Sequence, residues 1–366
     1  MKMIRWFLVV VVCMMVCSGC TARNDAQPSL EELAMIGVIA FDYIDNSKMK
    51  ITVIAPQPSP DAKEHTQSYE IEATLVKEGL VEISAKADRM VNLSQLRVAL
   101  FSEEFARNGK MVEVVKYLYR DADVRETVRL GIVKDNAGDV LTAEYPDKPN
   151  TNVYINNLLE PRLFTTFSPF TDLHIFVAQA TDPIISPSVP YLEVKENLPE
   201  ITKVALFNGN HMVGTVERGE GKLIQALSGV QKLAPSNINL SEEEEVILEF
   251  INSDVKFTSN NNFESPKITI ELTLQSALDE YKGPNKISSS NDLKKLEKDV
   301  EKRLEKEIHA LLAKLIELKA VPIGLLETYR IKYRGNWTKE MTTKMAAKAE
   351  FDIIVNVEIV NIGAIK

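Results

Sequence analysis

Cysteine is almost absent from this sequence. Its 366 residues contain three cysteines, and all three lie within the first twenty positions, at Cys13, Cys17 and Cys20. The rest of the chain can therefore form no disulfide and has to be stabilised by its apolar cores. With 45% hydrophobic and 26% charged residues, the composition is that of an ordinary globular protein. At roughly 150 residues per domain, the length predicts two or three domains.

Basic residues are fewer than acidic ones, with 43 Lys and Arg against 52 Asp and Glu. The formal net charge is −9, and we recognise a basic run only in the region near residue 300. Because phosphate binding needs a concentrated patch of Lys and Arg, we expect no nucleic-acid partner. The same balance argues against an electrostatic clamp on a membrane. Beyond residue 16, no stretch approaches the roughly 18 apolar residues that identify a membrane-spanning helix.

The motifs of common enzyme classes are missing as well. No HExxH or GxSxG motif occurs, no paired cysteines occur beyond residue 20, and the four histidines have no ligand spacing. Residues 219–222 (Gly-Glu-Gly-Lys) precede Leu223 instead of Ser or Thr, so they predict a hairpin or a helix start and not a phosphate loop. The acidic run Glu242–Glu245 predicts a solvated turn before a strand. We therefore predict no catalytic residue, no cofactor and no metal site.

The first twenty residues carry the clearest pattern in the chain. Lys2 and Arg5 form a short positive segment, and residues 6–16 are an unbroken apolar stretch. A helix of that length would cross only about half of the hydrocarbon layer, so the stretch fits the hydrophobic region of a secretory signal. The following residues, Cys-Ser-Gly-Cys at 17–20, resemble the lipobox of bacterial lipoproteins. The alternative is an uncleaved hydrophobic N-terminus with incidental cysteines.

The resemblance to a lipobox implies that the chain is anchored by lipid at Cys20. In bacterial lipoproteins the last cysteine of this motif receives a diacylglyceryl group, and the signal is then cut before it. We therefore expect residues 1–19 to be a signal peptide and the mature chain to lie outside the cytoplasm. At about 0.8 kcal/mol per buried CH₂, two acyl chains hold a protein firmly where one holds it only marginally.

Helical and extended patterns alternate along the rest of the chain. Alternation at period two and compact apolar runs predict strands at 35–43, 49–55, 96–101, 129–133, 189–194, 204–208, 212–216, 246–257, 268–274 and 351–360. Apolar spacings of three and four predict helices at 80–90, 103–107, 111–119, most of 153–181, 217–227 and 291–320. This mixture predicts an α+β fold in which β-sheets are flanked by α-helices.

A proline-rich segment, Asp182–Pro190, predicts the boundary between an N-terminal α/β region at 20–188 and a C-terminal α/β domain at 189–366. The longest predicted helix, Asn291–Ala320, lies in the second of these. Ser290 or Asn291 can cap it, and Pro322 requires it to end. Its apolar residues favour one amphipathic helix covering a face of the C-terminal sheet, with a coiled-coil dimer as the alternative.

Four segments resemble the Ger(x)C family, the C-subunit lipoproteins of nutrient germinant receptors in spore-forming bacteria. They are Asn92–Gly109, Tyr117–Val133, Val204–Gly214 and, near the C-terminus, Ile323–Trp337 with the closing residues VNVEIVNIGAI. In the second of these, three residues stand where the family has its l-x-R-D-x-x-x-R motif: Arg120, Asp121 and Arg125. We interpret these three residues as an internal ion-pair network in preference to a ligand site.

The resemblance implies a structural and signalling role and no catalysis. A member of this family would sit on the outer face of the inner spore membrane beside two integral membrane subunits, and the complex would respond to small nutrients. No direct ligand is assigned to the chain itself. Two alternatives remain at this point: a solute-binding lipoprotein that serves a transporter, and a secreted hydrolase.

Lipidation at Cys20 can be tested directly. Because Cys20 is the last thiol of the chain, Cys20→Ala should abolish labelling by radioactive palmitate and leave the protein uncleaved or released from the membrane. Cys13→Ala is the matched control and should keep the label. Label retained in Cys20→Ala would show that the anchor lies elsewhere.

Overall fold

The computed structural model describes residues 29, 32–56, 66–160, 162, 167–284, 287 and 289–362. The chain divides into two compact units, Met1–Leu33 and Ala34–Lys366. In the first unit the described residues include Ser29 and Glu32, which are joined by two hydrogen bonds. The Ser29 N–H donates to the Glu32 carboxylate at 2.8 Å, and the Glu32 N–H donates to the Ser29 carbonyl at 3.0 Å.

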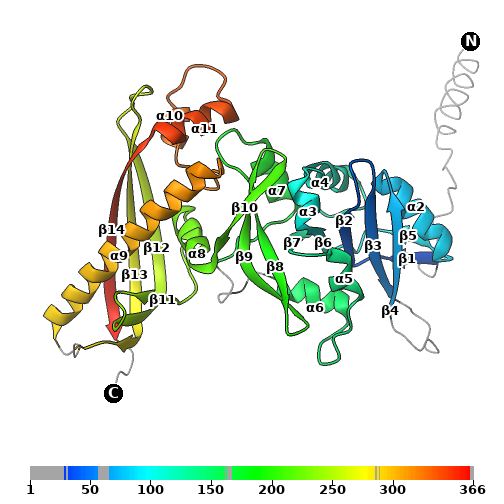
Figure 1. The fold of residues 1–366 in the computed structure, drawn as a ribbon, viewed down its shortest axis with the longest axis horizontal. Helices are drawn as coiled ribbons and strands as arrows, with labels where there is room; N and C mark the ends of the chain where they lie inside the picture. Colours follow the sequence, from blue (N-terminus) through cyan, green and yellow to red (C-terminus); the bar gives the residue numbers. More distant parts are fainter. Residues whose placement is uncertain are drawn as a thin grey trace, which may run out of the picture. The chain divides into compact units, whose positions relative to one another are not determined.

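The second unit holds almost all of the secondary structure (Figure 1). The strands are β1 (Leu33–Met35), β2 (Val38–Tyr43), β3 (Met49–Pro56), β4 (Thr66–Ala73), β5 (Met90–Asn92), β6 (Val98–Ser102), β7 (Arg129–Val133), β8 (Ser188–Lys195), β9 (Leu198–Asn208), β10 (His211–Glu217), β11 (Ser236–Asn239), β12 (Glu245–Ser259), β13 (Lys267–Lys282) and β14 (Glu350–Ile362). The helices are α2 (Val76–Lys86), α3 (Glu103–Arg107), α4 (Met111–Arg120), α5 (Ala137–Thr142), α6 (Thr151–Leu158), α7 (Leu173–Thr181), α8 (Arg218–Leu227), α9 (Ser290–Glu317), α10 (Glu327–Arg330) and α11 (Lys339–Lys348).

An eight-stranded sheet occupies the middle of this unit, in the order β10-β9-β8-β7-β6-β2-β3-β4. The central strands β2, β6, β7 and β8 are parallel, and antiparallel hairpins extend the sheet at both ends. Parallel strands of this kind are covered on both faces, which explains why they read as continuous apolar runs such as VALF in β6. The α+β fold predicted from the sequence is confirmed.

The sheet continues across the predicted domain boundary. Strand β8 begins within the segment Asp182–Pro190, at Ser188, and pairs with β7, which precedes the segment. Residues on both sides of this segment belong to one compact unit. The division into 20–188 and 189–366 stays a prediction.

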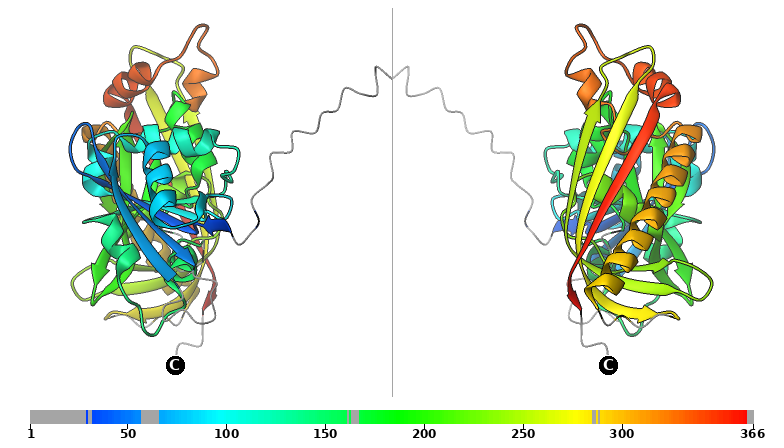
Figure 2. Two further views of the ribbon diagram at one scale, coloured as in Figure 1. Left: turned by 90° about the vertical axis from the view of Figure 1, so that its right-hand side faces the viewer. Right: turned by 90° about the vertical axis from the view of Figure 1, so that its left-hand side faces the viewer.

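A second sheet, in the order β11-β12-β13-β14, lies toward the C-terminus of the chain. Strands β13 and β14 are parallel, and the connection between them contains α9, α10 and α11. Helix α9 lies along this sheet beside β14 (Figure 2). Its apolar stripe is buried in the same core as the inner faces of β12, β13 and β14, so the single-chain interpretation of this helix is confirmed and the coiled-coil alternative is wrong.

The ends of α9 differ slightly from the prediction. The capping residue is Ser289, one position before Ser290 and two before Asn291, and it forms a capping box with Asp292. The helix ends at Glu317, and Lys319 then adopts a positive φ of 53°. The turn therefore comes before Pro322, and the proline is not what stops the helix.

Three glutamates of α9 bind the backbone of β14. Carboxylate oxygens of Glu297, Glu301 and Glu305 accept hydrogen bonds from the N–H groups of Ile359, Val357 and Val355, at 2.8, 3.0 and 3.3 Å respectively. The glutamates are four residues apart, which places them on one face of the helix, and the N–H groups are two residues apart, which places them on one edge of the strand. The two periods match because four helical residues advance about as far as two strand residues.

The helix predicted over most of 153–181 is wrong in its middle. The chain forms α6 and α7, and the described residues between Leu158 and Leu173 are not helical. Pro169 has no N–H to donate, and the Asp172 side chain accepts the N–H of Ile175 at 2.8 Å, which begins a new helix. Apolar residues in this segment, including Phe167, are buried without forming a helical stripe.

The three hydrogen bonds from β14 to Glu297, Glu301 and Glu305, which we call the glutamate ladder, should contribute measurably to stability. Glu301→Ala removes the acceptor of the Val357 N–H and should lower the free energy of unfolding by about 1 kcal/mol, because the bond is only partly buried. Glu301→Gln keeps an acceptor oxygen and should cost less. Lys302→Ala, on the exposed side of the same turn, is the control. Urea unfolding of the purified protein measures the free energy of unfolding of all three variants. An equal loss in Glu301→Ala and Lys302→Ala would contradict a stabilising role for the ladder.

Candidate functional site

The predicted lipidation residue, Cys20, lies outside the residues that the structure describes. The chain enters the second compact unit at Ala34. There the Ile36 N–H donates to the Asn92 carbonyl at 3.0 Å, and the Arg97 N–H donates to the Gly37 carbonyl at 2.9 Å. Within the described ranges, no helix is long and apolar enough to cross a membrane.

The residues that could support chemistry are dispersed. In the part of the chain that the structure describes, no group of three or more His, Cys, Asp or Glu side chains is placed to hold a metal ion. His174 Nδ1 lies 3.7 Å from the exposed carboxylate of Glu126, and His211 Nδ1 lies 2.9 Å from the carbonyl oxygen of Arg107. His65 lies outside the described residues. The segment 219–222 belongs to the first turn of α8, as one of the two predictions for it stated.

The three residues of the family motif do not form an ion-pair network. Arg120 ends α4, Asp121 caps it, and Arg125 lies in the loop before β7. Arg120 and Arg125 are exposed, and no ion pair within 4.0 Å joins any of the three to another described residue. The internal network inferred from the sequence is therefore wrong. Arg125 instead faces a hollow in the surface.

This arginine hollow has a volume of about 520 Å³ and is lined by residues from four separate segments. Its lining residues are Ser94, Gln95, Leu96, Arg97, Arg125, Thr127, Arg129, Asn156 and Phe170. Strand pairing brings two of the arginines together. Arg129 opens β7 beside the first residue of β6, and its backbone N–H donates to the Arg97 carbonyl at 2.8 Å. The hollow thus lies where these two parallel strands begin.

The arginines of the hollow differ in how they are held. The guanidinium of Arg129 is largely buried and donates to the backbone carbonyl and the side-chain oxygen of Asn156, at 2.9 and 2.6 Å. It also lies 3.9 Å from the carboxylate of Glu160. Arg97 and Arg125 are exposed, and neither forms an ion pair within 4.0 Å with a described residue. Positive charge therefore exceeds negative charge in this hollow.

A second surface feature is an apolar groove beside α11, with a volume of about 520 Å³. The lining residues are Phe263, Lys332, Tyr333, Arg334, Met341, Lys344, Met345 and Lys348. Aromatic contacts make one side rigid, since the ring of Phe263 packs edge-on against Tyr329 and also meets Tyr333. Helix α11 supplies the other side, with two methionines and two lysines at spacings of four. We call this feature the methionine groove.

The methionine groove lies in a basic part of the chain. Residues 330–348 contain six Lys or Arg and one Asp or Glu, whereas the whole chain has a net charge of −9. The expectation that basic residues concentrate only near residue 300 is therefore wrong. Of the groove's cations, Lys344 pairs with Glu340 at 2.6 Å, and Lys332 donates to the side chain of Asn261. The rim of the groove is positively charged.

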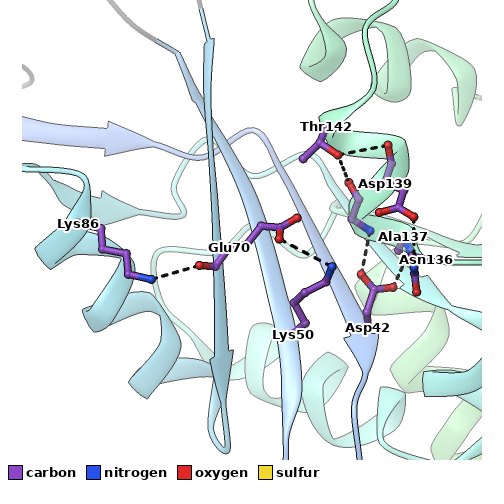
Figure 3. Close-up of polar contacts among 9 residues, drawn as sticks. Asp42, Lys50, Glu70, Lys86, Asn136, Ala137, Asp139 and Thr142 are labelled. Atoms are coloured by element: carbon purple, nitrogen blue, oxygen red, sulfur yellow. Dashed lines mark hydrogen bonds and ion pairs between the residues drawn. The ribbon is translucent and has the colours of Figure 1, made fainter.

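Asp42 is a buried carboxylate that a search for acid–base chemistry would select. It is 2% exposed, and its two oxygens accept the N–H groups of Ala137 and Gly138 at 2.6 and 2.9 Å (Figure 3). Burial raises its pKa, although these two N–H groups and the nearby Lys50 act in the opposite direction. A Cβ on Gly138 would lie 2.6 Å from the hydroxyl of Thr52. Asp42 therefore holds the start of α5 in a tightly packed place, which is a structural role.

Comparisons with known proteins identify the class to which this fold belongs. The family model described as spore germination protein N-terminal domain matches residues 25–194, and the model described as spore germination B3/GerAC-like, C-terminal, matches residues 202–363. Both describe spore germination proteins, and together they cover most of the chain. The chain belongs to the Ger(x)C family, and the resemblance inferred from the sequence is confirmed.

Relatives match along nearly the full length of the chain. Spore germination protein GerQC of Bacillus cereus is 23% identical over 98% of this chain and 99% of its own length. Spore germination protein B3 of Bacillus subtilis is 23% identical over 99% of this chain and 97% of its own. The crystal structure of the GerBC protein has a TM-score of 0.61 at 19% identity, covering 88% of this chain and 97% of GerBC. This last similarity concerns the fold alone.

Asp42 offers a test of the structural role assigned to it. Asp42→Ala leaves two buried N–H groups without an acceptor and should destabilise the protein by about 3 kcal/mol. Asp139→Ala removes an exposed carboxylate from the same turn of α5 and should cost well under 1 kcal/mol. Thermal and urea unfolding provide the measurement.

The raised pKa of Asp42 adds a pH dependence to this comparison. A carboxyl whose pKa is higher in the folded state contributes stability that is fully present below its unfolded pKa, and this contribution falls as the pH rises through the folded value. The difference between wild type and Asp42→Ala should thus be larger near about pH 4 than near about pH 7. A difference that grows with pH would contradict the raised pKa.

Proposed function

We propose that this chain is the lipid-anchored, non-catalytic subunit of a nutrient germinant receptor and is required for spores to germinate in response to small nutrients. The observation that carries this proposal is the match of two spore germination family models across residues 25–194 and 202–363. The anchor is Cys20, five residues before the start of the first matched segment. The matches favour this function over the solute-binding lipoprotein of a transporter.

The physical role of the anchor is to confine the subunit to a surface. A protein held at the membrane meets its neighbours at high effective concentration, so that weak contacts are enough for assembly. We place it on the extracytoplasmic face, which is the outer face of the inner spore membrane. Its partners are two integral membrane subunits.

The methionine groove is the surface that we assign to one of these partners. Its floor is apolar and its rim carries four cations, namely Lys332, Arg334, Lys344 and Lys348. An amphipathic segment with a parallel stripe of acidic residues complements both features. Methionine side chains are flexible and adapt to such a partner. Because the groove is concave, a flat bilayer would touch its rim and leave the floor uncovered.

Deletion of the chain should abolish the response to one set of nutrients and leave spore formation, and germination through other receptors, intact. Pull-down from detergent-solubilised spore membranes should recover two integral membrane proteins. The double variant Lys344→Glu/Lys348→Glu should weaken this recovery at least about tenfold. The two substituted residues would be negative and would repel the acidic stripe of the partner, which the lysines attract.

The control for the double variant is Lys294→Glu/Lys298→Glu. These lysines have the same spacing and are exposed on α9, and their reversal should leave recovery unchanged. A normal nutrient response in the deletion strain would refute the receptor function. Recovery of a permease and an ATPase would support the transporter alternative, and equal losses in both double variants would refute only the assignment of the groove.

A further inference from the structure

We infer that the arginine hollow is a binding site for a phosphate group. Three guanidinium groups, from Arg97, Arg125 and Arg129, line one depression, and Glu160 supplies the single carboxylate within 4.0 Å of any of them among the described residues. Glu160 also lies 3.9 Å from Arg162, so its charge is shared. An uncompensated group of arginines repels itself, and an anion relieves this repulsion.

The chemistry of the lining favours phosphate over a simple carboxylate. A guanidinium presents parallel N–H donors that match two oxygens of one phosphate, and several guanidinium groups can bind the remaining oxygens of a dianion. Hydroxyl groups of Ser94 and Thr127 and the amide of Asn156 provide neutral donors in the same depression. A carboxylate, with two oxygens and one charge, would leave part of this set unused.

One arginine is already in position. The two bonds from Arg129 to Asn156 fix the orientation of its guanidinium before any ligand arrives. Arg97 is tied through its backbone to Gly37 and to Arg129, while its side chain remains exposed. Because one of the three cations is fixed in advance, an anion that binds here has to order only the other two side chains. Its volume of about 520 Å³ accommodates a phosphate ester as well as the free ion.

Two sources of the phosphate group are consistent with this site, a soluble phosphate compound and a lipid headgroup. The second source rests on the proposed anchor at Cys20. If that residue is acylated, residues 21–33 span at most about 45 Å when extended. The hollow lies next to the place where the chain enters the compact unit, since Ser94 follows β5 and Arg97 bonds to Gly37. An anionic headgroup is then within reach.

The test uses the mature full-length protein in detergent, with inorganic phosphate as the first probe and calorimetry as the readout. Arg97→Gln/Arg125→Gln should weaken phosphate binding at least about tenfold, because each charge-assisted pair is strong. These side chains are exposed, so the fold should be kept, and thermal unfolding checks this. Arg120→Gln, an exposed arginine outside the hollow, is the control and should bind like wild type.

A second variant keeps the inference testable if the double variant is unstable. Arg125→Lys retains the charge but loses the paired donors, and it should bind phosphate more weakly than wild type. Absence of phosphate binding in the wild type would overturn the inference, and so would equal affinities in wild type, Arg97→Gln/Arg125→Gln and Arg120→Gln.

A second experiment distinguishes the two sources of the phosphate group, the soluble compound and the lipid headgroup. Protein in nanodiscs of phosphatidylcholine, with and without phosphatidylglycerol, is titrated with inorganic phosphate. Competition only when phosphatidylglycerol is present supports a lipid headgroup, and unchanged affinity in both supports a soluble phosphate compound. Because the phosphate titration needs neither spores nor partners, its failure would leave the proposed receptor function standing.

Discussion

The structure depends on a central sheet whose alternate side chains enter two separate apolar cores. In each central strand, one set of side chains points to one core and the next set to the other. The first core receives Val38, Ala40, Val98, Leu100, Leu192, Val204 and Leu206, and the second receives Ile39, Phe41, Ala99, Phe101, Tyr191, Ala205 and Phe207. With no cysteine beyond residue 20, these two cores replace the disulfides that hold many small exported domains.

The first core also explains why the two sheets form one unit. It continues from the central sheet through α8 to the inner face of the second sheet and the apolar stripe of α9. A bond between Lys314 of α9 and Glu220 of α8, at 2.7 Å, spans the same junction. The family models divide at residues 194 and 202, yet β9 begins at Leu198 and pairs with β8. Domains recognised by sequence therefore share a sheet in this protein.

The sequence was sufficient to predict a strand or helix wherever the spacing of apolar residues along the chain determines it. The predicted strand at 351–360 corresponds to β14, and the helix predicted at 217–227 corresponds to α8, because apolar residues recur there at spacings of two or of three and four. Strand β4 was missed, since its sequence TQSYEIEA is mostly polar and largely solvent-facing and it is extended only through its pairing with β3. Pairing of that kind is a tertiary effect.

The candidate sites could not be predicted from local sequence patterns for a related reason. The arginine hollow joins residues near positions 95, 127, 156 and 170, and the parallel pairing of β6 and β7 brings the first two of these segments together. Nothing in the spacing of Arg97 and Arg129 indicates this. The charge around the methionine groove could have been found in the sequence by counting over short windows, because the acidic remainder of the chain conceals it in the total.

The glutamate ladder has a consequence for how this protein can associate. An exposed edge strand offers its free N–H groups to any extended segment that can add another strand, and unprotected edges of this kind lead to aggregation or to uncontrolled pairing. In β14, three successive outward N–H groups are already occupied by side chains of α9. Strand augmentation is thereby blocked along this stretch of the edge, so a neighbour that approaches it meets the helix and must be recognised through side chains.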